Sequence, residues 1–163
     1  MQCTTSIEID LPLEQVARSL ADAALLPYWL RGMVVHEPVR GVHGEVGTVS
    51  RVVLRSGKRT MEVTETITRR EPQDLDAIPH GAVVRFEREI VGAGMWNAAR
   101  ERLTDAGPGR TLWVSENEYR FRNPLTRLMA LLLPGAFRTQ QLQHMEDFKA
   151  FAEDGRDVRD DTA

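Results

Sequence analysis

The sequence predicts an α+β protein that combines an antiparallel β-sheet with one long C-terminal helix. A strand-like stretch and two short helical stretches come first, within residues 3–30. Six strand-like runs separated by turns then occupy residues 33–121, and the one long helical pattern covers residues 123–153. The short connections between successive runs favour an antiparallel meander, because parallel strands need long crossover connections.

Length and composition are those of one globular domain. The chain has 163 residues, of which 42% are hydrophobic and 28% charged, and a chain of this length can bury a sizeable core. We expect a single domain over residues 1–153. Residues 154–163, DGRDVRDDTA, carry too little apolar surface to pack, so we expect them to form a disordered polar tail.

Charge, cysteine content and hydropathy limit the possible binding partners of the protein and its possible location in the cell. The 21 basic and 24 acidic residues form no long block, which argues against nucleic acid as a partner. Cys3 is the single cysteine, so we expect neither an intramolecular disulfide nor a thiolate metal site. Residues 1–10 lack the features of a signal peptide, and no apolar run approaches the ~20 residues of a membrane-spanning helix. We therefore expect a cytoplasmic protein.

The first elements are a strand and two short helices. Residues 3–9, CTTSIEI, have the β-branched character of a strand. Residues 11–22 place apolar side chains at helical spacing, and Pro12 suits the first turn of that helix. A second helical piece covers residues 23–30. It ends on Tyr28 and Trp29, which either pack at a helix corner or form the wall of a pocket mouth.

Alternation along the six strand-like runs separates an inner from an outer face, because successive side chains of a strand point to opposite sides. The runs are residues 33–39, 46–54, 59–70, 82–90, 95–103 and 111–121. Polar side chains that share an apolar face with hydrophobic neighbours are Glu65, Arg88, Ser115, Asn117 and Tyr119.

The run at residues 95–103 does not identify its inner face, because both alternating sets mix apolar and polar side chains. Two sets remain open. The first is Trp96, Ala98 and Arg100, and the second is Met95, Asn97, Ala99 and Glu101.

The long helical pattern begins at Asn123, a good N-cap, with Pro124 in the first turn. Pro134 and Gly135 should kink or divide it, because an internal proline removes a hydrogen bond and clashes with the preceding turn. Helical spacing from Phe137 onward places one wide apolar face opposite a polar face. The apolar face collects Phe137, Leu142, Met145, Phe148, Phe151 and Ala152, and the opposite face collects Thr139, Gln143, Glu146, Asp147 and Ala150.

Gln141 and His144 fall within the apolar face of this helix, where an unpaired polar group would be costly to bury. With them the inward polar set has seven members, more than a solid core of this size hides comfortably. A Glu65–Arg88 ion pair would account for two. The remainder favours a pocket for a small molecule. Its expected apolar walls are Trp29, Trp96 or Met95, Trp113, Phe137, Met145 and Phe148, and its expected orienting groups are Glu65, Arg88, Asn117, Tyr119, Gln141 and His144.

The order of elements, and four segments in particular, resemble the SRPBCC (START-like) superfamily and within it the polyketide cyclase/dehydrase-like group. The segments are SIEIDLPLEQVARSLADAALLPYW at 6–29, VRGVHGEVGTV at 39–49, VTETITRREPQDL at 63–75 and the helical stretch at 123–153. The resemblance implies a helix-grip fold, in which a curved antiparallel sheet of six to seven strands wraps around the long C-terminal helix. It also implies an apolar ligand, such as a lipid or a polyketide, held between the sheet and that helix.

Three functions follow as hypotheses. The first is a protein that binds an apolar small molecule without a cofactor. The second is a cyclase or dehydratase, with Glu65 or His144 as the base and Arg88, Tyr119 or Asn117 as the donor to a developing enolate. The third is a protein-interaction module or homodimer that uses the sheet edge or the segment Leu131, Leu132 and Leu133, unless that segment packs over the mouth of the barrel. The spacing of His36, His43, His80 and His144 predicts no metal site.

Overall fold

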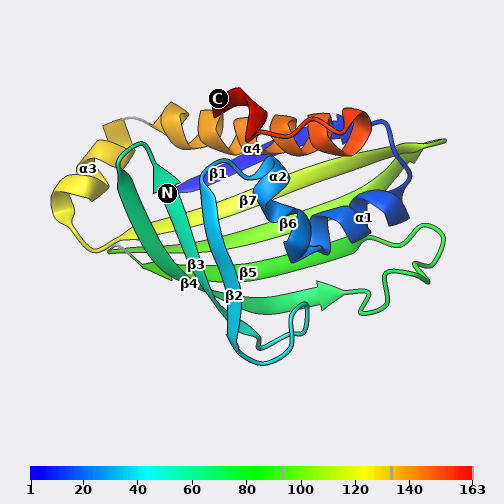
Figure 1. Ribbon diagram of the computed structural model, residues 1–163, viewed down its shortest axis with the longest axis horizontal. Helices are drawn as coiled ribbons and strands as arrows, with labels where there is room; N and C mark the ends of the chain where they lie inside the picture. Colours follow the sequence, from blue (N-terminus) through cyan, green and yellow to red (C-terminus); the bar gives the residue numbers. More distant parts are fainter. Residues whose placement is uncertain (93, 133, 163) are drawn as a thin grey trace.

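Seven antiparallel strands form one curved sheet in the computed structural model, which describes residues 1–92, 94–132 and 134–162 (Figure 1). The strand order is β1-β7-β6-β5-β4-β3-β2, so a six-stranded meander is completed by the first strand pairing with the last. This confirms the predicted helix-grip architecture. The strands are β1 (Gln2–Ile9), β2 (Met33–Arg40), β3 (Val49–Ser56), β4 (Arg59–Glu71), β5 (Val84–Gly92), β6 (Met95–Gly107) and β7 (Arg110–Phe121).

The boundaries of several helices coincide with proline or capping residues. The first helices are α1 (Leu13–Ala21), a 3-10 turn η1 (Ala23–Leu25) and α2 (Leu26–Trp29). The predicted long helix is divided into α3 (Pro124–Leu132) and α4 (Pro134–Asp154), as the proline predicts. Asn123 caps α3, because its Oδ1 accepts a 2.8 Å hydrogen bond from the backbone N–H of Leu125. Figure 1 shows α4 beside β1, with α3 at one end of the molecule.

The hydrophobic core lies at one end of the space between the sheet and α4. Phe148 of α4 is fully buried there. Its ring meets Trp29 of α2 and Trp113 of β7 edge-on, with centroid distances of 5.1 and 5.3 Å. Leu13 and Val16 of α1 complete this cluster from the other side. Burying a large aromatic side chain contributes ~2–3 kcal/mol, so the cluster anchors α4 on the sheet.

The expectation of a disordered tail over residues 154–163 is wrong for the part of the tail that the structure describes. Val158 is buried, and its backbone N–H donates a 2.9 Å hydrogen bond to the carbonyl of Tyr28. Arg31 bridges Asp147 of α4 at 2.6 Å and Asp161 of a short 3-10 turn, η2 (Asp160–Thr162), at 2.9 Å. One apolar anchor and one arginine therefore hold a segment whose composition alone predicts disorder. Ala163 lies outside the described residues.

The same contacts surround Asp147, which the helical spacing places on the polar face of α4. It is buried, and Arg31 donates to both of its oxygens, at 2.6 and 2.8 Å. The helical spacing was correct, but residues 155–162 cover that flank of α4 and bring the arginine with them.

One face of α3 carries exposed apolar side chains at helical spacing. Leu125, Leu128, Met129 and Leu132 are each 48–66% exposed. Of the expected Leu131–Leu133 contact segment, only Leu132 has a side chain that the structure describes. No helix among the described residues is long and apolar enough to cross a bilayer.

Candidate functional site

A cavity of about 300 Å³ lies between the inner face of the sheet and α4. Apolar side chains from the six strands β2–β7 and from α2 and α4 form most of its surface, and several polar groups converge on it. This is the usual make-up of a small-molecule site. Its lining includes Leu26, Trp29, Leu30, Met33, Val52, Leu54, Met61, Val63, Ile90, Met95, Ala99, Trp113 and Phe137, together with His36, Glu65, Arg88, Asn97, Glu101, Asn117, Tyr119, Gln140, Gln141 and His144.

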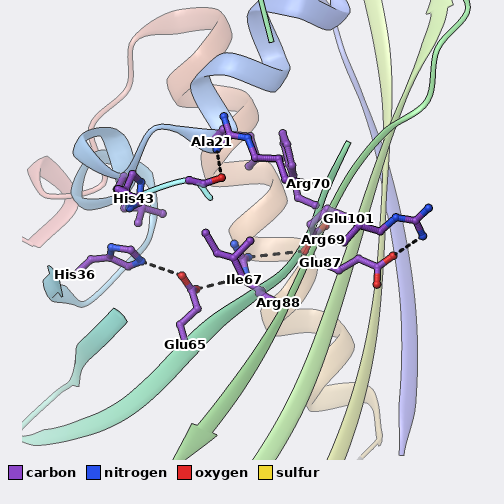
Figure 2. Close-up of a pocket in the computed structure, with 15 residues that line it drawn as sticks. Ala21, His36, His43, Glu65, Ile67, Arg69, Arg70, Glu87, Arg88 and Glu101 are labelled. Carbon is purple, nitrogen blue, oxygen red and sulfur yellow. Dashed lines mark hydrogen bonds and ion pairs between the residues drawn. The ribbon is translucent and has the colours of Figure 1, made fainter. Parts of the chain in front are cut away.

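A second, smaller chamber of about 70 Å³ adjoins the first, between the end of α1, the β2–β3 connection and the strands β4 and β5 (Figure 2). His36, Glu65, Arg88 and Glu101 line both spaces, as does Leu26. These four polar side chains therefore lie where the large cavity and the small chamber adjoin. We call them the polar wall.

Glu65, on β4, is the ionised member of the polar wall. His36 Nε2 lies 3.0 Å from its Oε1, and the Nε of Arg88 lies 3.7 Å from its Oε2, so the expected Glu65–Arg88 ion pair is confirmed. Burial raises the pKa of Glu65, but the hydrogen bond from His36 and the charge of Arg88 outweigh it, and the net pKa is lowered. A carboxylate can only accept, so the His36 Nε2 carries the proton in this contact.

Glu101, on β6, has the opposite character. Its side chain is buried, and it accepts hydrogen bonds from Trp113 Nε1 at 2.6 Å and Ser115 Oγ at 3.1 Å. Arg88 Nη2 lies 3.8 Å from Oε1. Burial is the largest influence and raises the pKa of Glu101, although the arginine and the two donors partly offset it. The polar wall thus contains one carboxylate favoured in its charged form and one shifted toward its neutral form.

A chain of side-chain hydrogen bonds continues from Glu101 through the hydroxyl of Ser115 to three amide side chains. Ser115 Oγ accepts from Asn117 Nδ2 and from Gln141 Nε2 of α4, both at 3.0 Å. Asn97 Nδ2 donates to Asn117 Oδ1 at 3.2 Å. These groups satisfy one another's hydrogen-bonding capacity, and the bond from Gln141 links α4 to β7. Other side chains on the cavity are therefore better placed to meet the polar atoms of a ligand.

Four buried nitrogens of residues on the large cavity have no hydrogen-bond partner among the described residues: Trp29 Nε1, His36 Nδ1, Arg88 Nε and His144 Nδ1. The indole and guanidinium nitrogens can only donate. Burial lowers the pKa of His144, which favours its neutral form near pH 7, with one ring nitrogen able to accept. Burial likewise raises the pKa of Tyr119 to about 12, so its phenol keeps its proton. The cavity therefore offers donors to a ligand that carries acceptor oxygens.

The structure brings most of the predicted site residues to the cavity. Trp29, Glu65, Arg88, Trp113, Asn117, Tyr119, Phe137, Gln141 and His144 all line it. On β6 the inner set is Met95, Asn97, Ala99 and Glu101, the second of the two open alternatives.

Three expected cavity residues lie elsewhere. Trp96 is on the outer face of β6, where the Arg120 guanidinium sits 4.5 Å from its ring centroid. Met145 is fully buried, and its sulfur lies 3.2 Å from Thr5 Oγ1 of β1, so it fills the space between α4 and the edge strand. Phe148 lies in the core. For Met145 and Phe148, burial in the core and exposure to a cavity give the same sequence pattern, whereas Trp96 belongs to the alternating set of β6 that faces outward.

Sequence reasoning missed two members of the polar wall. Glu101 belonged to an alternation that could be read either way, and His36 lies on a strand whose inner face carries few apolar residues. His36 and His43 approach each other with ring centroids 5.5 Å apart. Even so, no group of three histidine, cysteine or carboxylate side chains in the described ranges has the arrangement of a metal site.

Comparison with known proteins identifies the fold and the family. A family model described as "Polyketide cyclase / dehydrase and lipid transport" matches residues 1–153. No curated protein matches the chain in sequence.

Several solved structures share the fold over nearly the whole chain. The protein TTHA0849 from Thermus thermophilus is 16% identical with a TM-score of 0.71, covering 93% of this chain and 97% of that protein. The Zhui aromatase/cyclase from a Streptomyces species is 12% identical with a TM-score of 0.71, covering 94% and 93%. Norcoclaurine synthase from Thalictrum flavum is 16% identical with a TM-score of 0.63, covering 93% of each chain. Identities this low establish the common fold alone.

Proposed function

Because the chain belongs to the polyketide cyclase/dehydrase and lipid transport family, we propose that its large cavity binds one apolar small molecule that carries acceptor oxygens. The observation that carries this proposal is that two buried donors on a mostly apolar cavity of about 300 Å³, Trp29 Nε1 and Arg88 Nε, have no hydrogen-bond partner among the described residues. An unpartnered buried donor costs ~1–3 kcal/mol. A ligand oxygen that meets Trp29 Nε1 or Arg88 Nε would recover that cost, whereas a pure hydrocarbon would not.

The direct test is native mass spectrometry of the protein purified from its own host, followed by solvent extraction and identification of what is bound. A stoichiometric molecule with an apolar body and carbonyl, hydroxyl or carboxyl oxygens supports the proposal. Protein that carries nothing, and whose melting temperature does not respond to a panel of lipids, quinones and aromatic polyketides, contradicts it.

The alternative function is catalysis of ring closure on a poly-β-carbonyl chain in the same cavity. It is favoured by His144, a neutral imidazole whose Nδ1 has no partner among the described residues and which faces the same space as the donors Trp29 and Arg88. A base would remove an α-proton, the enolate carbon would attack a second carbonyl, and the resulting alkoxide would take up a proton. Glu65 is the less suitable base, because its lowered pKa makes it a weak proton acceptor.

This alternative is tested by following cyclised product by liquid chromatography and mass spectrometry with wild type and with a Glu65→Gln/His144→Gln variant. Loss of turnover with retained substrate affinity supports an acid/base role. Unchanged turnover in the double variant excludes one.

The third candidate function, an interaction module or homodimer, is favoured by the exposed apolar face of α3. Contiguous exposed apolar surface is uncommon unless it meets a partner. A second copy of this chain is the simplest such partner, because identical faces can pair about a two-fold axis.

A further inference from the structure

The small chamber contains an arginine without a counter-ion among the described residues. Arg70 of β4 donates from Nη1 to the carbonyl of Gly44 at 3.0 Å, but its buried Nε has no hydrogen-bond partner and no carboxylate of the described residues lies within ion-pair distance. Its neighbour Arg69 differs, since it contacts Glu71 at 2.9 Å and Glu87 at 3.2 Å. A half-buried cation is costly without an anion nearby.

The guanidinium of Arg70 is held in one place by the β2–β3 connection. Gly44 has a backbone φ of +87°, and a Cβ at this position would collide with Arg70 Nη1. Glycine thus permits both the left-handed backbone and the close approach that brings its carbonyl to the arginine. Because the Gly44 carbonyl binds only Nη1, the arginine's Nε remains available to a further acceptor.

The rest of the small chamber also favours an anion. Two buried guanidinium nitrogens that have no hydrogen-bond partner among the described residues, Arg70 Nε and Arg88 Nε, belong to residues that line it, and both can only donate. Of its carboxylates, Glu65 and Glu87 already pair with other cations, and burial shifts Glu101 toward its neutral form. Figure 2 shows the Arg70 side chain well apart from the carboxylate of Glu65. An anion beside Arg70 would therefore gain an attraction that no described protein group supplies.

We propose that the small chamber binds an oxyanion, and that this oxyanion is the carboxylate of the ligand whose apolar body occupies the large cavity. This step rests on the proposed function. The side chains of the polar wall line both spaces, so a ligand in the large cavity lies next to the small chamber, and about 70 Å³ accommodates one small group such as a carboxylate. The ligand class is accordingly an amphipathic carboxylic acid, with Arg70 as the residue that selects it.

The test compares two probes with the same body, 1-naphthaleneacetic acid and 2-(1-naphthyl)ethanol, by isothermal titration calorimetry at pH 7.5. Wild type should bind the acid at least ~10-fold more tightly than the alcohol, as expected for a charge-assisted hydrogen bond. Arg70→Gln should abolish this preference and leave the affinity for the alcohol within about two-fold. Arg69→Gln is the matched control and should keep the preference, because Arg69 already has carboxylate partners.

Each outcome separates the two levels of inference. If the alcohol binds but the acid has no advantage in wild type, or if Arg70→Gln keeps the advantage, the oxyanion site is overturned and the apolar cavity is not. If neither probe binds, the proposed function fails as well. The wild-type comparison needs no variant, so it remains decisive if Arg70→Gln does not fold. Arg70→Lys, which keeps the charge but not the forked donors, should retain part of the preference.

A further arm identifies the source of the anion. Sodium acetate should weaken the binding of the acid probe and leave the alcohol unaffected if acetate competes for Arg70. The other outcome is that acetate protects wild type but not Arg70→Gln against thermal unfolding, while wild type shows no preference for the acid probe. That outcome would mean that the chamber binds a free anion, and it would overturn the assignment to the ligand's carboxylate.

Discussion

Glu101 and Trp113 join the cavity to the hydrophobic core through a 2.6 Å hydrogen bond from the indole Nε1 to the carboxyl Oε2. Both side chains are buried, on the adjacent strands β6 and β7. Trp113 packs edge-on against Phe148 on one side and lines the cavity on the other. A change of charge at Glu101 should therefore alter both the electrostatics of the cavity and the packing of α4.

Substitution Glu101→Gln should remove a pH dependence of stability. Because burial raises the pKa of Glu101 above its ordinary value of 4.5, the folded state holds this proton more tightly than the unfolded state does. Wild-type stability should then fall as the pH rises from about 4.5 through the raised pKa, by at most ~1.4 kcal/mol per pH unit. In urea unfolding, the free energy of unfolding of the Gln variant should increase relative to that of wild type between pH 5 and pH 8. A constant difference between the two proteins would contradict the assignment.

Substitution Glu65→Gln should have the opposite pH dependence. Its folded-state pKa is lowered by His36 and Arg88, so its contribution to stability is present above its ordinary value of 4.5 and is lost as the pH falls through the lowered pKa. We expect a loss of ~1–3 kcal/mol at pH 7, because the ion pair with Arg88 and the charge-assisted hydrogen bond from His36 Nε2 are both weakened. The loss should shrink in urea unfolding at pH 4 and below. Thr66→Ser, on the outer face of the same strand, is the control and should change little.

Filling the cavity should block the ligand. Ala99 lines the large cavity from the centre of the sheet, so Ala99→Phe places a ring where the ligand would lie. Affinity for 2-(1-naphthyl)ethanol, measured by calorimetry, should fall at least ~10-fold, with a stability change below ~2 kcal/mol because the ring enters open space. The control Thr64→Phe adds the same ring to the outer face of β4. Equal losses of affinity in the two variants would argue against the cavity as the binding site.

The two phenylalanines of α4 should differ in their contribution to stability. Phe148 is fully buried between Trp29 and Trp113, and Phe148→Ala should cost ~3–5 kcal/mol. Phe137 is half-buried on the cavity, and Phe137→Ala should cost only ~1–2 kcal/mol and weaken ligand binding. Chemical denaturation with calorimetry on both variants checks this. A larger loss for Phe137 would show that the core and cavity assignments are reversed.

The apolar face of α3 predicts self-association. Light scattering after size-exclusion chromatography should give a mass above that of one chain at tens of micromolar concentration, and Leu128→Glu should return the protein to the monomer. Val39→Glu alters an equally exposed apolar residue on β2 and should leave the mass unchanged. If wild type is already monomeric at that concentration, α3 is not a homodimer surface.

The outcome for β6 and the tail illustrates what single-chain patterns miss. The alternation at residues 95–103 left two faces open because Trp96 and Met95 are both apolar, and only the register with Phe121 and Arg120 of β7 places Met95 inside. Similarly, Arg31 and Asp161 are ordinary charged residues in the sequence, and their 2.9 Å contact across 130 positions, together with the burial of Val158, holds the C-terminal segment on the domain.

The sequence by itself determined the elements, the division of the long helix at Pro134, and nine of the twelve expected cavity residues. Those features depend on local periodicity, capping and proline geometry, which each segment carries alone. The tertiary structure alone decided that Glu65 meets His36, that Glu101 is buried beneath Arg88, and that Arg70 lacks a counter-ion among the described residues. Charge states and unpaired donors arise from which distant side chains meet and how much water they lose, and neither is encoded in any single stretch of the chain.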